Sequence, residues 1–230
     1  MKTLLRSARL LALLLAVTFI LTACGGAGGG QQGSGSGGEQ GTADKTGGSM
    51  AGMDHSQMGH GSMGMGSGEM AWQMVMENGK YSDKAFIDAM VPHHQGAIAM
   101  ARVALKNAEH EEIKELSRNI ISSQQAEIEE LKAIKKEEFG TSNVPMEMSQ
   151  EQMRSMGMMD PQQLANKEPF DKAFIDAMIP HHQSAIEMAQ VAYEKSRIPE
   201  IKELAKNIVS AQQREIEQMK EWRKEWYPQS

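Results

Sequence analysis

Residues 83–104 are DKAFIDAMVPHHQGAIAMARVA, and residues 171–192 are DKAFIDAMIPHHQSAIEMAQVA. A second stretch, EIKELSRNIISSQQAEIEEL at 112–131, returns as EIKELAKNIVSAQQREIEQM at 200–219. The offset is 88 residues in both cases, and 31 of the 49 positions from Asp83 to Leu131 are identical in the second copy without a gap. Such an internal repeat indicates a duplicated structural unit.

Each copy has the pattern of two amphipathic helices joined by a turn. Spacings of three and four place one set of residues on a single helical face: Phe86, Met90, His93, Ala97, Met100 and Ala104. A second set follows after the predicted turn at 106–111: Ile113, Leu116, Ile120, Gln124, Glu127, Leu131 and Ile134. One hairpin cannot bury its apolar face alone, but two can cover each other, so we predict an all-α four-helix bundle of two tandem hairpins.

Prolines and a capping motif modify this pattern. Pro92 and Pro180 lie inside the first helix of each copy, where a proline cannot donate the helical hydrogen bond. Either the helix kinks there or a new helix starts. Between the copies, Ser149-Gln-Glu-Gln152 has the form of a capping box and predicts a short helix.

The amino terminus has the pattern of a secretory signal peptide. A basic start is followed by a short apolar core that ends in Leu21-Thr22-Ala23-Cys24. This end resembles the bacterial lipobox, so we predict cleavage after residue 23 and lipidation of Cys24; the alternative is an ordinary signal peptide with an incidental cysteine. Cys24 is the only cysteine in the chain, so an intrachain disulfide and a thiolate metal site are excluded.

Composition divides the chain into five segments. We predict a signal peptide at 1–23, a flexible Gly/Ser-rich then Met/His-rich tether at 24–76, and repeat 1 at 77–140. A Met-rich linker at 141–170 and repeat 2 at 171–230 follow. Two methionine tracts occur, at 50–70 in the tether and at 146–159 in the linker. Tether methionines have no core to fill and thioethers bind soft ions, so we predict copper or silver capture by both tracts, although methionine is also a common filler. The predicted tether ligands are Met53, His55, Met58, His60, Met63 and Met65.

The charge balance is acidic. The chain has 24 Lys and Arg against 30 Asp and Glu. Three of the basic residues lie in 1–23, so the mature chain would keep 21, with a net charge of −9. This balance argues against nucleic acid or an anionic membrane surface as a partner. We therefore expect the lipid on Cys24, and not charge, to attach the protein to a membrane.

A Met-x-x-His-His motif occurs in both repeats, and a further methionine follows seven residues after the first histidine. These spacings place the groups on or near one helical face. Imidazole and thioether together suit copper, above all Cu(I), whereas Ca and Mg prefer oxygen. The alternative is a core of methionines with structurally satisfied histidines, but the whole set is retained in the duplication. The predicted ligands are Met90, His93, His94, Met100, Met178, His181, His182 and Met188.

Polar residues on the second stripe could support these ligands. Gln124 and Glu127, with Gln212 and Glu215 in repeat 2, fall among apolar positions. A buried carboxylate or amide needs a hydrogen-bond partner. Either the helix is rotated so that both face solvent, or a glutamate accepts the spare N–H of a histidine and orients it. We expect His93 to face inward with Glu127 or Glu215 as its buried partner.

The repeat D-K-A-F-I-D-A-M-x-P-H-H-Q-x-A-I-x-M-A, followed by Q-Q-x-E-I, resembles the bacterial domain-of-unknown-function family 305. The resemblance covers about residues 80–139 and 168–227. It implies a ferritin-like helical fold, and it implies copper binding or copper tolerance outside the cytoplasm, as in some members. The family's His-His motif corresponds to His93, His94, His181 and His182, and its methionines to Met90, Met100, Met178 and Met188.

The leading hypothesis is a non-catalytic, extracytoplasmic, lipid-anchored copper protein that sequesters the ion, gives tolerance or delivers copper to a copper-handling partner protein. A ferritin-like di-metal oxidase is the alternative enzyme, but it needs a Glu three residues before a helical His, where this chain has Met90 and Met178. A structural or partner-binding helical module with incidental metal is the third hypothesis. The sequence leaves open whether the two histidine pairs form two sites or one.

Overall fold

The computed structural model describes residues 71–229. The predicted signal peptide, Cys24 and the tether ligands between Met53 and Met65 lie outside the described residues. Four long helices dominate: α1 (Asp83–Asn107), α2 (Glu111–Phe139), α5 (Phe170–Lys195) and α6 (Pro199–Trp226). Two short helices, α3 (Gln150–Ser155) and α4 (Pro161–Ala165), lie in the connection between α2 and α5.

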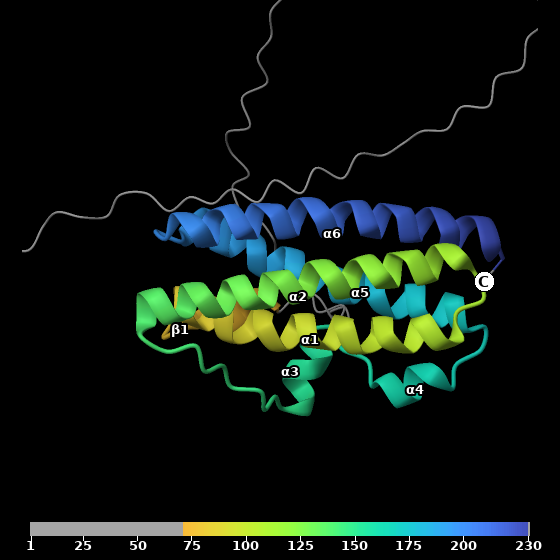
Figure 1. Ribbon diagram of the computed structural model, residues 1–230, viewed down its shortest axis with the longest axis horizontal. Helices are drawn as coiled ribbons and strands as arrows, with labels where there is room; N and C mark the ends of the chain where they lie inside the picture. The colour runs from red at the N-terminus through yellow and green to blue at the C-terminus, as the bar shows by residue number, and fades with distance from the viewer. Residues whose placement is uncertain (1–70, 230) are drawn as a thin grey trace, which may run out of the picture. The chain divides into compact units, whose positions relative to one another are not determined.

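The four long helices form the predicted bundle (Figure 1). Helix α1 packs on α2 and α5, and α6 packs on α5 and α2, so each hairpin covers the apolar face of the other. Helix α1 runs antiparallel to α2 and α5, whereas α2 and α5 run in the same direction and need a long crossover (Figure 1). One long crossover is the connectivity of ferritin-like bundles, which confirms the predicted fold class.

The inner prolines do not divide the helices. Helix α1 continues through Pro92, and α5 continues through Pro180. Each proline removes one helical hydrogen bond at the residue before a histidine pair. The rest of each helix is held by packing in the bundle, which explains why the helix does not end there.

Residues 71–76, which the sequence assigns to the end of the tether, are part of the folded structure. Residues Ala71–Val75 form a 3₁₀ helix, η2, that packs on α1 and α5. Ala71 and Val75 are fully buried in the core. Strands β1 (Met76–Glu77) and β2 (Lys80–Tyr81) then form a small antiparallel hairpin, which the periodicity did not predict. The boundary is corrected because apolar residues on both sides of Met76 are part of the fold.

The core consists of two apolar clusters, and all four long helices contribute to both. The first cluster contains the first part of α1, the last part of α2, the last part of α5 and the first part of α6. The second cluster contains the opposite parts of the same helices. The buried histidines occupy the stretches of α1 and α5 between these two clusters. The bundle thus has a polar layer near its middle.

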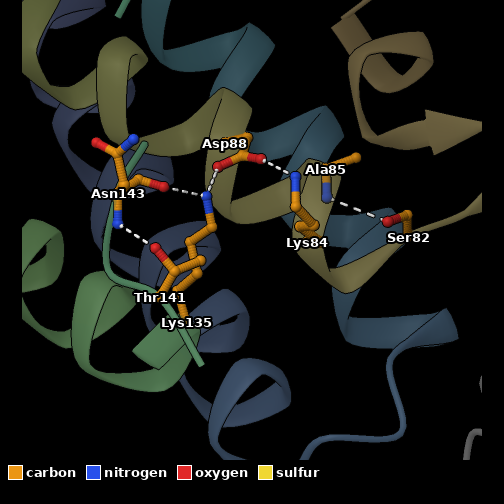
Figure 2. A network of polar contacts seen from close by, with 7 residues as sticks. All are labelled: Ser82, Lys84, Ala85, Asp88, Lys135, Thr141 and Asn143. Carbon is orange, nitrogen blue, oxygen red and sulfur yellow. Dashed lines mark hydrogen bonds and ion pairs between the residues drawn. The ribbon is translucent and has the colours of Figure 1, made fainter. Parts of the chain in front are cut away.

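A buried lysine fastens the crossover to the first hairpin (Figure 2). The Lys135 ammonium group, on α2, contacts the carboxylate of Asp88 on α1 and the backbone carbonyl of Asn143 in the crossover. Lys84 contacts the other oxygen of Asp88 at 2.7 Å. Further along the crossover, the side chains of Ser149 and Gln152 form the predicted capping box of α3. Among residues 71–229, no helix has the length and apolar character needed to cross a bilayer.

Candidate metal centre

Four buried imidazoles follow one another across the middle of the bundle. His93 and His94 lie on α1, His181 and His182 lie on α5, and all four have no solvent-exposed surface. The ring centroids of His93 and His181 are 3.8 Å apart. Each of these rings is 6.2 or 6.3 Å from the ring of the next residue in its own helix. The two pairs therefore meet in one histidine layer, and they are not separated into two distant sites.

The outer histidine of each pair lies against a glutamate from the second helix of its own hairpin. His182 Nε2 and Glu215 Oε2 are 2.6 Å apart, and because a carboxylate accepts, the ring donates from Nε2. His94 Nε2 and Glu127 Oε2 are 2.7 Å apart, but they are not aligned as a hydrogen bond. The predicted contact of a glutamate with a histidine is thus present in both repeats, while its role beside a metal stays a prediction.

The partner of His93 differs from the prediction. His93 Nε2 lies 2.7 Å from the hydroxyl of Ser184 on α5, and neither Glu127 nor Glu215 bonds to it. The same hydroxyl is 2.9 Å from the carbonyl of Met156 and 2.7 Å from the carbonyl of His181. Its one proton goes to a carbonyl, so Ser184 accepts from His93 Nε2–H. His93 Nδ1 then carries a lone pair, and it is buried without a hydrogen bond.

The central ring of the second pair is held less firmly. Neither Nδ1 nor Nε2 of His181 makes a hydrogen bond. Burial lowers the pKa of both His93 and His181 well below the ordinary histidine value, and the neighbouring histidines lower it further. The backbone of His93 opposes part of this effect at His181. Both central rings are therefore neutral near pH 7, which is the form that binds a metal ion.

The predicted methionines are all buried on the two sides of the histidine layer. Met90 and Met188 belong to the first apolar cluster, and Met100 and Met178 belong to the second. They pack among aliphatic and aromatic side chains, as core methionines do. Their thioethers flank the layer symmetrically, because each cluster takes one methionine from each repeat.

Two methionines of the linker tract, which the sequence predicts to capture copper or silver, lie at the layer; the tract prediction did not place them beside the histidines. Met156 is fully buried, and its carbonyl accepts the Ser184 hydrogen bond. Met158 is partly buried, and its Cε would lie 2.7 Å from a Cβ added to Gly96. His181 Nε2 would lie 3.3 Å from that Cβ. The cluster at 146–159 was visible in the sequence, but the path of the crossover was not.

The role of the two glutamines beside the histidines stays a prediction. Gln124 and Gln212 are buried, as the stripe predicts. However, Gln124 Oε1 and both polar atoms of Gln212 make no hydrogen bond, so neither amide orients a histidine through these atoms. Within residues 71–229, no group of three or more His, Cys, Asp or Glu side chains is arranged to hold a metal ion. The donors that this layer does offer, imidazole nitrogens and nearby thioethers, suit a soft ion better than a hard one.

Comparison with known proteins agrees with the repeat and the fold. The domain of unknown function DUF305 matches twice, over residues 30–135 and 135–223. The chain belongs to the DUF305 family. A crystal structure of a DUF305 fragment from Deinococcus radiodurans shares 27% identity and a TM-score of 0.55, over 60% of this chain and 92% of the other.

Structures of CopM are also similar to this DUF305 protein. The Cu(II)-bound form of CopM shares 44% identity and a TM-score of 0.60, over 64% of this chain and 99% of CopM. The Cu(I)-bound form shares 40% identity and a TM-score of 0.57 over the same fractions. An uncharacterized protein of Acanthamoeba polyphaga mimivirus is 43% identical over 49 residues, which are 21% of this chain. The match spans about a third (32%) of that viral protein's length.

Proposed function

We propose that this DUF305 protein binds copper, as Cu(I) in the histidine layer of its bundle. Silver(I) has similar ligand preferences and would occupy the same layer. The similarity to CopM, which has been solved with Cu(I), Cu(II) and Ag, supports this proposal. The ion is cargo that the protein captures, and the layer supplies imidazole nitrogens with thioethers nearby.

One observation carries the proposal. Four imidazoles are fully buried, yet Nδ1 of each ring has no hydrogen bond. A buried polar atom without a partner lowers stability by about 1–3 kcal/mol, so four such atoms in one layer call for a ligand. The contact of the outer rings with Glu127 and Glu215 leaves Nδ1 as the nitrogen that faces away from the carboxylate. A bound Cu(I) ion would use unpaired nitrogens of these rings without competing with protons at neutral pH.

We place this activity outside the cytoplasm, on a membrane. The support is the signal-peptide pattern of residues 1–23 and the lipobox that ends at Cys24. The Met/His tract between Met53 and Met65 would collect soft ions. In this arrangement the protein sequesters copper for tolerance or delivers it to a copper-handling partner protein.

A Cu(I) titration against a competing chelator tests the proposal. The protein is residues 24–230 with Cys24→Ser, so that no thiol competes. In a tract variant, the four methionines and two histidines predicted as tether ligands are changed to leucine and asparagine. In a layer variant, all four bundle histidines are changed to leucine. The tract variant should keep one tightly held ion, and the layer variant should lose it while circular dichroism shows an intact bundle. Full retention of that ion in a folded layer variant would refute the proposal.

A ferritin-like di-metal oxidase is the competing function. Its ligand set requires carboxylates three residues before the helical histidines, and Met90 and Met178 occupy these positions in the buried core. We infer a binding protein and not an enzyme. Loading with Fe(II) and following oxygen consumption is the direct check, because catalytic turnover would overturn this inference.

A further inference from the structure

The two repeats differ at one position beside the histidines. Gly96 on α1 and Ser184 on α5 are equivalent, because they lie 88 residues apart and follow His94 and His182 by two residues. Ser184 is fully buried, and its hydroxyl accepts from His93 Nε2. Gly96 has no side chain to do the same for His181. The duplication has therefore left one central imidazole anchored and the other without a hydrogen bond.

The space at Gly96 is occupied by the crossover. A Cβ on Gly96 would lie 2.7 Å from Cε and 3.5 Å from Cγ of Met158. These are the two carbons bonded to the thioether sulfur. The same Cβ would lie 3.3 Å from His181 Nε2. The Met158 side chain and an unbonded imidazole nitrogen of His181 thus both border the space where the other repeat carries a hydroxyl.

The backbone around Met158 is fixed against α5. Gly157 has a φ of +64°, and a Cβ there would lie 2.8 Å from the backbone nitrogen of His181. Only glycine allows this approach and this conformation without strain. On the other side of Gly157, the Met156 carbonyl accepts from Ser184 at 2.9 Å. The amide of Met158 donates to the carbonyl of Met153 at 2.9 Å. The thioether is therefore presented to the layer by a well-determined turn.

We propose that Met158 and His181 Nε2 form a thioether–imidazole site for Cu(I) or Ag(I) on one side of the histidine layer, and that Gly96 is the residue that makes room for it. A hydroxyl at position 96 would bond to His181 Nε2 and displace the thioether, which is the situation of His93 beside Ser184. The layer is thus asymmetric: His93 offers Nδ1 only, whereas His181 offers Nε2 together with a sulfur ligand. Thioether and imidazole are the donor pair that selects a soft monovalent ion. This inference rests on the proposed function of the layer.

The test uses the tract variant with Cys24→Ser, labelled with ¹³C at the methionine methyl groups and ¹⁵N in the histidine rings. Silver(I) serves as the redox-inert probe, and Met158→Leu assigns the methyl signal. One equivalent of Ag(I) should shift the Met158 methyl signal and the His181 Nε2 signal together. Loss of an outer-shell partner already lowers metal affinity by about 10–100-fold, so Met158→Leu should lower Ag(I) affinity by at least about tenfold.

Matched variants separate this site from the fold and from the layer as a whole. Met153→Leu changes an exposed methionine of the same linker and should leave the affinity unchanged. Gly96→Ala moves the thioether without adding a hydroxyl, and Gly96→Ser does both, so Gly96→Ser should weaken Ag(I) binding at least as much as Gly96→Ala.

If Ag(I) shifts histidine signals but not the Met158 methyl signal, the proposed function survives and this site is wrong. If the Met158 methyl shifts without His181, the thioether binds elsewhere and the site is also wrong. If no layer signal shifts, both proposals fail.

Discussion

The two repeats share 31 of 49 aligned positions, yet their central histidines have different surroundings. His93 is anchored by Ser184, while His181 lies beside Gly96 and the thioether of Met158. Two hairpins can pack with two-fold symmetry, but a single crossover between them cannot. The linker therefore creates a difference at the centre of a nearly symmetric bundle, and the Gly/Ser exchange matches that difference.

A second contrast lies at the equivalent acidic residues. In repeat 1, Asp88 bonds to Lys84 and to Lys135, whose side chain is buried and also holds Asn143 of the crossover (Figure 2). In repeat 2, Asp176 bonds to Lys172 at 2.9 Å and to Arg223 at 2.8 Å, but it is largely exposed. The same pairing is thus structural and buried where the crossover passes, and it is a surface feature where no crossover passes.

The largest expected effect compares the central histidines directly. In the tract variant, His181→Ala should lower Cu(I) affinity by about 100-fold, and His93→Ala by about tenfold, because only His181 is paired with a thioether. Competition with a chelator measures both values. Equal losses would show that the two repeats contribute alike, and they would remove the asymmetry drawn from Gly96 and Ser184.

The second prediction concerns the buried ion pair. Lys135→Met keeps the buried aliphatic stem but leaves the partly buried Asp88 carboxylate and the Asn143 carbonyl with one partner fewer, so the free energy of unfolding should fall by about 2–3 kcal/mol. Arg223→Met removes the equivalent contact of an exposed pair and should change it by less than about 1 kcal/mol. Urea unfolding of the metal-free proteins measures both. Equal values would mean that the crossover contact contributes nothing beyond the surface pair.

The sequence predicted the symmetric part of this molecule and missed the asymmetric part. The apolar periodicity of α1 and α2 predicted the bundle and the burial of His93, because periodicity shows which face of a helix packs against the core. This periodicity could not predict Ser184 as the hydrogen-bond partner of His93, since that contact depends on how closely α1 and α5 pack. The position of Met158 depends on the path of the crossover, which has no periodic pattern. Ala71 and Val75 fall within the predicted tether, because a short apolar segment beside a Gly/Met-rich tract has no periodic pattern that would predict its burial.

The third prediction concerns pH and tests whether burial acts equally on the two central rings. Because burial lowers the pKa of His93 and His181, the unfolded chain binds more protons than the folded chain below about pH 6.5. The free energy of unfolding of the metal-free protein should therefore fall as the pH drops below 6.5, by about 1.4 kcal/mol per pH unit for each ring. Above that pH these rings should contribute no slope.

Single variants divide this slope between the repeats. His93→Leu and His181→Leu should each remove about half of it, and the double variant should remove both contributions, as measured by urea unfolding between pH 5 and pH 7.5. If one single variant removes nearly all of the slope, only that ring resists protonation, and the comparison between the repeats extends to their protonation. An unchanged slope in the double variant would show that other groups cause the pH dependence.

The smallest expected effect lies at the helix starts, where the repeats also differ. The Ser82 hydroxyl accepts from the backbone N–H of Ala85 at 3.2 Å and caps α1 (Figure 2). Pro169 precedes α5 and supplies no such bond. Ser82→Ala should therefore lower the free energy of unfolding by about 1 kcal/mol, and Tm by about 2–4 °C, whereas Ser82→Asp should keep the cap. Ser149→Ala removes the cap of α3, a helix that buries none of its residues, and it should change Tm less. The loss of a cap lowers the Tm of global unfolding only when the capped helix unfolds together with the rest of the protein. If Ser149→Ala lowers Tm as much as Ser82→Ala, unfolding of the crossover is therefore coupled to the bundle as strongly as unfolding of the start of α1.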